Sequence, residues 1–490
     1  MASGSAGSMP LTGQEGINVI MTNDYQSFVA SKMATVDTTG IDIDRSVLND
    51  NLFEYQRDIV AWALRRGRSC IFADCGTGKT LMQLVWADVV GGETGGRVLI
   101  LAPLAVADQT VREGERFGIG VEHVETVEQA EASDARILIT NYARLERFAH
   151  MPWAGIVLDE SSILKSYDGA TRNAIITGFA HVPYRLACTA TPAPNDHMEL
   201  GNHSEFLGVK TRVEMLAEYF VHDGGETSTW RLKGHAEDIF WRWVCSWAVF
   251  IRKPSDLGYS DVGYEMPELV MRDRVLSVEH RDAWSEGYLF APDVKTLSDQ
   301  RATRRATLAK RVAEAAALVA AEPHEPWMIW CELNDESAAL TKAIPHAVEV
   351  AGSHADDVKA DRLLGFAEGR YQILVSKPSI AGWGMNYQHC ARTIFVGASH
   401  SYEQTYQALR RFWRYGQKRD VHAYVIRAET EGAISANLAR KEADAQRMAD
   451  GMLEHMQEAQ RLAVRGSMKE WNPYQPSVEM TIPAWCTKEA

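Results

Sequence analysis

The sequence predicts an α/β protein with two tandem lobes, each a parallel sheet with flanking helices, and with helical insertions between the lobes. Short apolar runs alternate with helical stretches in both halves of the chain, and these runs are continuously hydrophobic. Continuous hydrophobicity is typical of strands that are covered on both faces, as in a parallel sheet. Helical stretches between such strands suit crossover connections. A segment of different composition divides the two series, so we expect two separate lobes.

Apolar runs in two series are the expected strands. The first lobe should use residues 69–73, 97–102, 136–140, 155–158 and 185–189. The second lobe should use residues 328–331, 347–351, 373–376, 393–397 and 422–426. A helix over residues 80–90 should connect the first two strands of the first lobe.

The segment between the two series is rich in aromatic residues, among them Trp241, Trp243 and Trp247. These side chains could stack on nucleic-acid bases, but closely spaced aromatics on a helix more often pack in a core, and we expect core packing. Residues 301–321 have Ala-rich helical periodicity. The predicted division is an N-terminal extension (1–48), a first lobe (49–200), a helical insertion with linker (201–325), a second lobe (326–432), and a C-terminal helix and tail (433–490).

Composition narrows the class of protein. The 490 residues, 46% hydrophobic and 24% charged, are enough for two to four globular domains. No apolar run is long enough to cross a membrane and no secretory leader is recognisable, so we expect a cytoplasmic protein with no membrane partner. The seven cysteines form no CxxC pair, which predicts reduced, mostly buried thiols and no zinc site. The net charge of −14 argues against a basic coat protein of nucleic acid, but it does not exclude a protein that confines its phosphate contacts to one groove.

Residues 73–80, Ala-Asp-Cys-Gly-Thr-Gly-Lys-Thr, lie between an expected strand and an expected helix. This is the setting of a phosphate-binding loop, in which backbone N–H groups and a helix N-terminus surround phosphates. Gly76, Thr77 and Gly78 would form the loop. Lys79 would reach the β- and γ-phosphates, and the Thr80 hydroxyl would ligate Mg²⁺. The loop therefore predicts nucleotide binding.

Residues 156–160 form an apolar strand that ends in two carboxylates. Asp159 is placed to hold Mg²⁺, and Glu160 is placed to polarise the attacking water. A strand followed by a charged turn is the alternative interpretation, and it is common in isolation. Downstream of a phosphate loop, the pair predicts hydrolysis of ATP or GTP.

Further segments follow in a fixed order along the chain. They are Tyr55-Gln56, residues 102–104 with Pro103, residues 140–142 with Thr140, residues 189–192 with Thr189 and Thr191, residues 381–386 with Gly384 and Asn386, and residues 407–417 with Arg411 and Arg414. Taken with the phosphate loop and the two carboxylates, they resemble the motifs of superfamily 2 helicases and translocases over about residues 52–427. The resemblance implies two RecA-like lobes with ATP bound between them.

The resemblance also implies roles for these residues. Gln56 would read the adenine edge, which suggests ATP over GTP, and Gly384 would contribute to the ATP site from the second lobe. Arg411 and Arg414 would reach the ATP site across the gap, with Arg414 as the arginine finger. Another group would contact the nucleic-acid backbone or couple it to ATP: Pro103, Thr140, Thr189, Thr191 and Asn386.

Within the superfamily, the Swi/Snf-type branch is the most similar. Residues 159–165 resemble its D-E-x-H-x-x-K pattern and residues 411–417 resemble its R-x-x-R-x-G-Q pattern. The whole chain also looks like the helicase-like proteins of tailed bacteriophages, which would place it in the cytoplasm of a bacterial host. Three residues depart from the family pattern: Ser162 stands where histidine is common, Trp383 where a small residue is common, and Arg410 where an acid or glycine is common.

The function that this resemblance implies is a DNA-stimulated ATPase that translocates on duplex DNA or remodels DNA and protein–DNA complexes, with ATP and Mg²⁺ as cofactors. A strand-separating DNA or RNA helicase is an alternative of the same class, with RNA the less favoured partner. An ATP-switched clamp that holds DNA with little turnover is an alternative of another class. A replication, recombination or defence protein is a possible partner.

Overall fold

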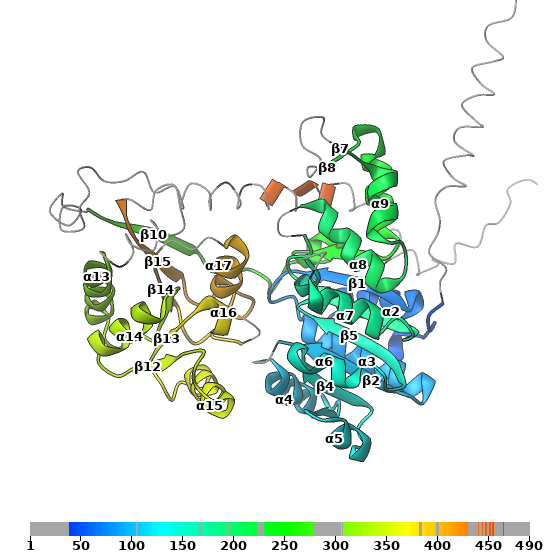
Figure 1. The fold of residues 1–490 in the computed structure, drawn as a ribbon, viewed down its shortest axis with the longest axis horizontal. Coiled ribbons are helices and arrows are strands. Elements are labelled where there is room, and N and C mark those ends of the chain that lie inside the picture. Colours follow the sequence, from blue (N-terminus) through cyan, green and yellow to red (C-terminus); the bar gives the residue numbers. More distant parts are fainter. Residues whose placement is uncertain are drawn as a thin grey trace, which may run out of the picture.

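The computed structural model contains two α/β lobes that lie side by side (Figure 1). It describes residues 39–103, 106–165, 169–193, 196–222, 230–277, 305, 307–381, 385–397 and 401–429, and single residues between 440 and 464. The predicted C-terminal helix over residues 433–464 and the first part of the predicted helix over 301–321 therefore lie largely outside the described residues.

The first lobe is built on a seven-stranded parallel sheet with the strand order β3-β4-β2-β5-β6-β1-β9. Its strands are β1 (Arg68–Ala73), β2 (Arg97–Ala102), β3 (Val121–His123), β4 (Ile137–Asn141), β5 (Trp153–Asp159), β6 (Tyr184–Thr189) and β9 (Ala248–Ile251). Its helices are α2 (Glu54–Arg66), α3 (Lys79–Thr94), α4 (Ala107–Phe117), α5 (Val127–Ala132), α6 (Leu145–Phe148), α7 (Ala170–Gly178), α8 (Leu200–Leu207), α9 (Arg212–Tyr219) and α10 (Glu237–Cys245).

Both faces of this sheet are covered. Alternate residues of one strand enter different cores: Ile71 packs with α2 and α3, whereas Cys70 and Phe72 pack with α8 and α10. A strand buried on both sides needs apolar residues at consecutive positions, which explains the continuous hydrophobic runs. A short antiparallel hairpin, β7 (Phe220–His222) with β8 (Trp230–Leu232), projects beyond the lobe next to α9 (Figure 1).

The second lobe is built on a six-stranded parallel sheet with the order β10-β15-β14-β11-β13-β12. Its strands are β10 (Leu269–Leu276), β11 (Trp327–Cys331), β12 (Ala347–Val350), β13 (Ile373–Ser376), β14 (Arg392–Val396) and β15 (Val421–Ala428). Its helices are α13 (Leu308–Ala321), α14 (Asn334–Ala343), α15 (Asp356–Ala367), α16 (Pro378–Ala381) and α17 (Tyr402–Leu409). Helices α13 and α14 cover one face of the sheet, and α15, α16 and α17 cover the other.

Short 3₁₀ turns complete the described elements: η1 (Arg45–Val47), η2 (Tyr142–Arg144), η3 (Ser161–Lys165), η4 (His197–Glu199), η5 (Gly234–Ala236) and η6 (Pro254–Leu257). No described helix is both long and apolar enough to pass through a bilayer.

The predicted fold class is confirmed, since both lobes contain parallel sheets with flanking helices. Each of the expected strands is present within one or two residues of its expected bounds. The three tryptophans of the intervening segment pack in a core, because Trp241, Trp243 and Trp247 are 2%, 7% and 0% exposed. The described cysteines, residues 70 to 390, are free and buried, as expected.

The segment predicted as a helical insertion, residues 201–325, also supplies strands to both sheets. Strand β9 pairs with β1 at the edge of the first sheet, and β10 pairs with β15 at the edge of the second. The prediction gave this segment as a helical insertion with linker and did not include these two strands. The apolar run of β9 follows directly on the aromatic helix α10, and β10 carries alternating charges that do not resemble a buried strand.

Candidate functional site

The phosphate loop (residues 73–80) connects β1 to α3 at the carboxyl edge of the first sheet. Gly76 and Gly78 have φ angles of 89° and 83°, a left-handed conformation that glycine adopts without steric cost. Because a Cβ atom at Gly78 would collide with the Gln56 amide, this position also needs glycine for space. The Lys79 ammonium donates a hydrogen bond to the Ala73 carbonyl at 2.7 Å, so its charge lies inside the loop. The loop can therefore surround an anion, with Lys79 as counter-charge.

Gln56 lies beneath this loop and is 2% exposed. Its amide nitrogen donates to the Thr77 carbonyl at 2.8 Å, and its amide oxygen accepts from the Phe53 backbone N–H at 2.8 Å. The adjacent Tyr55 hydroxyl also donates to the Thr77 carbonyl, at 2.7 Å. In this conformation Gln56 supports the phosphate loop, and its amide is already paired. Its predicted reading of adenine would require these bonds to change.

The two predicted carboxylates follow β5 at the same edge of the sheet, where the carboxyl ends of parallel strands meet. Asp159 is 8% exposed and accepts a hydrogen bond from Gln83 of α3 at 2.8 Å. Burial, with the neighbouring Glu160, raises the pKa of Asp159 to about 6, although Gln83, Lys79 and Arg411 act in the opposite direction. A buried carboxylate with few hydrogen-bond donors suits a cation ligand, because a metal ion would restore the solvation that burial removes.

Glu160 has a φ of 54°, a left-handed conformation that is uncommon for a residue with a side chain. Its side chain is buried, and its Oε2 atom has no hydrogen-bond partner among the described residues. The Oε1 atom lies 3.7 Å from Nη2 of Arg411, which belongs to the second lobe. Glu160 is thus held in a strained turn with one oxygen available to accept a proton.

Arg411 and Arg414 belong to the turn that follows α17, and Arg414 lies against the phosphate loop while Arg411 lies near Glu160. Arg411 is fixed by Gln407, to whose side-chain oxygen and carbonyl it donates at 3.0 and 3.2 Å. A Cβ atom on Gly76 would lie 3.4 Å from Cβ of Arg414, so the two backbones approach closely. The Nε atom of Arg414 is buried without a hydrogen-bond partner among the described residues, and burial, with Arg411 nearby, lowers its pKa. Both arginines therefore lie where an anion on the loop would meet them.

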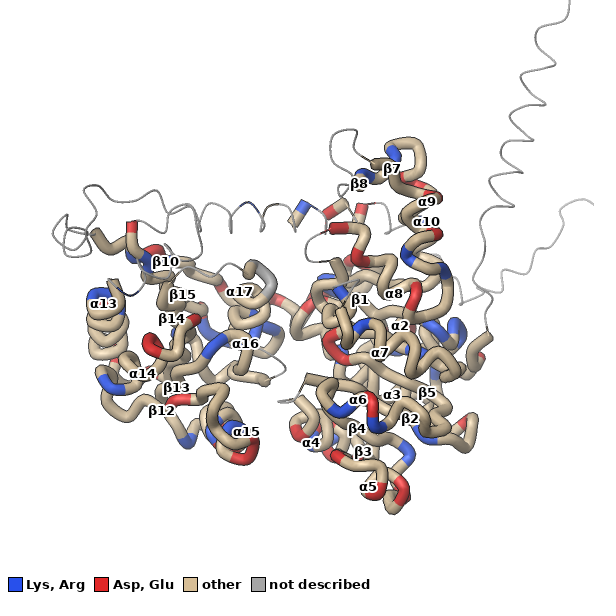
Figure 2. Tube along the Cα trace, in the orientation of Figure 1, with Lys and Arg blue, Asp and Glu red and all other residues tan. Residues whose placement is uncertain are grey.

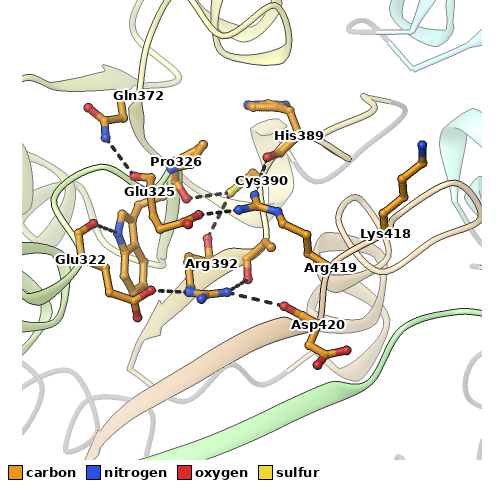
Figure 3. Close-up of polar contacts among 12 residues, drawn as sticks. Glu322, Glu325, Pro326, Gln372, His389, Cys390, Arg392, Lys418, Arg419 and Asp420 are labelled. Atoms are coloured by element: carbon orange, nitrogen blue, oxygen red, sulfur yellow. Dashed lines mark hydrogen bonds and ion pairs between the residues drawn. The ribbon is translucent and has the colours of Figure 1, made fainter.

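The turn that carries these arginines is anchored to the far side of the second lobe. Gln417 donates to the carbonyls of Gln388 and Cys390 at 3.0 and 3.2 Å. Arg419 pairs with Glu325 at 2.8 Å and donates to the His389 carbonyl at 2.8 Å (Figure 3). These bonds tie the turn to residues 388–390 before β14 and to Glu325 before β11, so its position follows that of the second lobe.

The residues predicted to contact nucleic acid or to couple it to ATP have different environments. Thr140 and Thr189 are fully buried, so in this conformation they cannot contact a nucleic-acid backbone directly. Thr191 lies at the lobe boundary, where its hydroxyl accepts from the Gln407 amide at 3.5 Å. Pro103 lines an interlobe cavity of about 540 Å³, described below. Asn386 accepts a bond from the Gln388 backbone at 3.2 Å.

Gly384, predicted to contribute to the ATP site, lies outside the described residues, as does Trp383. Among the residues that the structure describes, no group of three or more His, Cys, Asp or Glu side chains could hold a metal ion. Mg²⁺ does not need such a group, because it usually binds through one or two carboxylates together with substrate phosphates. Asp159 and Thr80, on neighbouring elements, fit that pattern.

Sequence reasoning missed several residues of this site. Gln83 holds Asp159. Asp74 of the phosphate loop is bonded across the lobe boundary by Tyr406 and by Arg410, at 2.8 and 2.6 Å. The departure of Arg410 from the family pattern was visible in the sequence, but its partner lies 336 residues away.

Comparison with known proteins yields a match to the family model of the SNF2-related domain over residues 55–219. This stretch contains the phosphate loop, both carboxylates and six of the strands of the first sheet. No curated protein matches the chain. Among solved structures, the Sulfolobus solfataricus SWI2/SNF2 ATPase core in complex with dsDNA is similar, with 17% identity and a TM-score of 0.40, covering 86% of this chain and 99% of that one.

Proposed function

We propose that the protein is an ATP hydrolase whose two lobes close around the nucleotide to drive movement along duplex DNA or the remodelling of DNA complexes. The observation that carries this proposal is the approach of Arg411 to Glu160 across the lobe boundary, at 3.7 Å. It brings a cation of one lobe to the carboxylate beside the phosphate loop of the other. A site divided in this way works only when the lobes are together, so anything that binds both lobes controls turnover.

The roles of the residues follow from their positions. The phosphate loop would hold the β- and γ-phosphates through its backbone N–H groups, with the Lys79 ammonium moving from the Ala73 carbonyl to the phosphates. Glu160 would orient the attacking water and accept its proton on the oxygen that has no other described partner. Arg411 and Arg414 would neutralise the negative charge that develops as the γ-phosphoryl group leaves. Bound Mg²⁺, held by Thr80 and Asp159, would supply further positive charge at the phosphates.

Duplex DNA is the proposed track for two reasons. Residues 159–165 and 411–417 resemble the Swi/Snf-type patterns, and the SNF2-related match covers the first of them. Strand separation remains an alternative of the same class, and a phage origin remains a prediction from the sequence. The clamp with little turnover is less favoured, because Glu160, Arg411 and Arg414 are all present at the site.

The test is the rate of ATP hydrolysis measured without nucleic acid and with single-stranded DNA, duplex DNA or RNA. We expect the highest rate with duplex DNA. Lys79→Ala, which removes the counter-charge for the phosphates, should abolish turnover and weaken ATP binding. Equal rates in all four conditions would contradict a nucleic-acid motor, and wild-type hydrolysis by a folded Lys79→Ala protein would contradict the assignment of the loop.

A further inference from the structure

The phosphate loop is bonded to the second lobe through the carboxylate of Asp74. Arg410 Nη2 lies 2.6 Å from Asp74 Oδ2 and donates a second hydrogen bond, at 2.9 Å, to the Cys75 carbonyl. The Tyr406 hydroxyl donates to Asp74 Oδ1 at 2.8 Å. We call these three side chains, Asp74, Tyr406 and Arg410, the latch. It joins the loop to α17 without the participation of Lys79, Glu160 or Arg411.

The latch is shielded from water. The Arg410 side chain is 3% exposed and the Asp74 side chain is 16% exposed, so solvent screens their attraction only weakly. The Trp413 ring lies 5.0 Å from the Arg410 guanidinium and covers it. In a buried pair, removal of one partner leaves the other charge without compensation. Removal of either charge should therefore disfavour the contact between the lobes far more than removal of a charge from an exposed pair would.

The second lobe lies directly against the Gly76 side of the loop, beside a small cavity. The cavity lined by residues 74–77, Tyr264, Arg410 and Tyr415 has a volume of about 200 Å³. Pockets for small ligands usually measure about 300–1,000 Å³. Tyr415 and Tyr264 stack at a centroid distance of 4.5 Å, and a Cβ atom on Gly76 would lie 2.9 Å from the Tyr415 backbone nitrogen. The second lobe thus covers the Gly76 side of the loop, and a nucleotide that used this side would need the lobes to separate.

We propose that Arg410 is a positioning residue that holds the second lobe on the nucleotide-free phosphate loop through Asp74, so that ATP must break the latch to bind. The inference rests on the proposed ATP function and adds a cost to nucleotide entry. When only a fraction of the molecules is open, the apparent dissociation constant rises in proportion to the inverse of that fraction. An acid at position 410, as in the related pattern, would instead repel Asp74, so the latch depends on the departure noted in this sequence.

The test uses Arg410→Gln in the full chain, which keeps most of the side-chain length but removes the charge. We expect the dissociation constant of a non-hydrolysable ATP analogue to fall by roughly tenfold, because the open fraction rises. Arg410→Lys, which keeps a charge that can pair with Asp74, should bind within about threefold of the wild type. The matched control is Arg112→Gln, which breaks the exposed interlobe pair of Arg112 with Glu368, 3.3 Å apart, and should leave the dissociation constant unchanged.

A second measurement does not require ATP. Energy transfer between dyes placed on the two lobes should be high in the nucleotide-free wild type and lower in Arg410→Gln and in Asp74→Asn. The double variant should show no further change, because either substitution alone removes the pair. Unchanged energy transfer, or weaker binding of the analogue by Arg410→Gln, would overturn the latch. If the wild type does not bind the analogue at all, the proposed ATP function fails, while the energy transfer still decides on the latch.

Discussion

The two ends of the boundary between the lobes differ in charge. At the phosphate loop, cations of the second lobe meet anions of the first, as in the pairs of Arg410 with Asp74 and Arg411 with Glu160. At the other end lies the interlobe cavity of about 540 Å³, and carboxylates line it from both sides. Acidic residues mark α4 and α15, the helices on either side of it (Figure 2). The acids of the cavity are Asp108 and Glu125 of the first lobe and Asp356 and Asp357 of the second.

This difference shows where contact between the lobes is stabilised without a ligand. Opposite charges attract at the phosphate loop in buried pairs, whereas the cavity is lined by carboxylates of both lobes. The interlobe pair at that end, Arg112 of α4 with Glu368 at the end of α15, is exposed and contributes little. Pro103 lines the cavity and Asn141 lines a smaller one beside it, so both belong to the face predicted to bind nucleic acid. If duplex DNA lies on this face, as proposed, its phosphates would meet cations such as Arg144 and Lys359, which are now paired with Glu125 and Asp356 at 3.0 and 3.2 Å.

The largest loss of ATP hydrolysis is expected from replacing the arginines at the phosphate-loop end of the boundary. Arg414→Ala should lower the rate of DNA-stimulated ATP hydrolysis by about 10³–10⁵-fold, the range for arginine fingers in phosphoryl transfer. ATP binding should change far less, because the first lobe holds the ground state. Arg414→Lys should not restore the full rate, since an ammonium lacks the planar fork of donors. Near-normal hydrolysis by Arg414→Ala, with a large loss in Arg411→Ala, would move the finger to Arg411.

The second largest loss of ATP hydrolysis is expected from Glu160→Gln. The amide keeps the shape but cannot accept the proton, so hydrolysis should fall by about 10²-fold or more while ATP still binds. Single-turnover rates and ATP affinity, measured side by side, check this. An equal loss of ATP affinity would mean that Glu160 acts through structure, by its ion pair with Arg411.

At the cavity end, we expect a smaller effect, which is a gain in affinity for duplex DNA rather than a loss of activity. Replacing both Asp356 and Asp357 with Asn should tighten duplex DNA binding by about twofold to tenfold at low salt, because two repelling charges are lost. For the wild type, log affinity should fall linearly with log salt, by about 0.9 for each phosphate neutralised, with little dependence on sequence. The gain of the variant should shrink as salt rises. Unchanged DNA affinity at low salt would place the DNA away from this cavity.

The smallest effect concerns stability and pH. The pKa of Asp159 is about 6 in the folded protein against an ordinary value of 3.8, so ionisation of this group costs folding free energy above pH 6 and nothing below pH 4. Asp159→Asn should therefore be more stable than the wild type at pH 8, by on the order of 1–3 kcal/mol, and equal to it at pH 4. Denaturant unfolding without Mg²⁺ measures the difference. An equal gain at both pH values would contradict burial as the cause.

Much of the site could be predicted from the chain because it is local. A phosphate loop needs glycine at positions 76 and 78 and lysine at position 79, so the residues that define it are close together in the sequence. Most strands could also be predicted from the sequence, because a strand buried on both faces has to be apolar throughout. Strands β3, β9 and β10 were not predicted, because β3 and β9 are short and β10 is an edge strand with largely exposed side chains.

The sequence by itself determined the two sheets, the loop and the residue types that face a phosphate. Only the tertiary structure decided which charges meet. In the sequence, Arg410 is only a departure from the family pattern, but the fold places it 2.6 Å from Asp74. Gln56 was predicted to bind the adenine base, but in the structure its amide is paired with Thr77 and Phe53. The physical reason is range: backbone conformation is set by neighbours in the chain, whereas a buried ion pair depends on the relative position of two separately folded lobes.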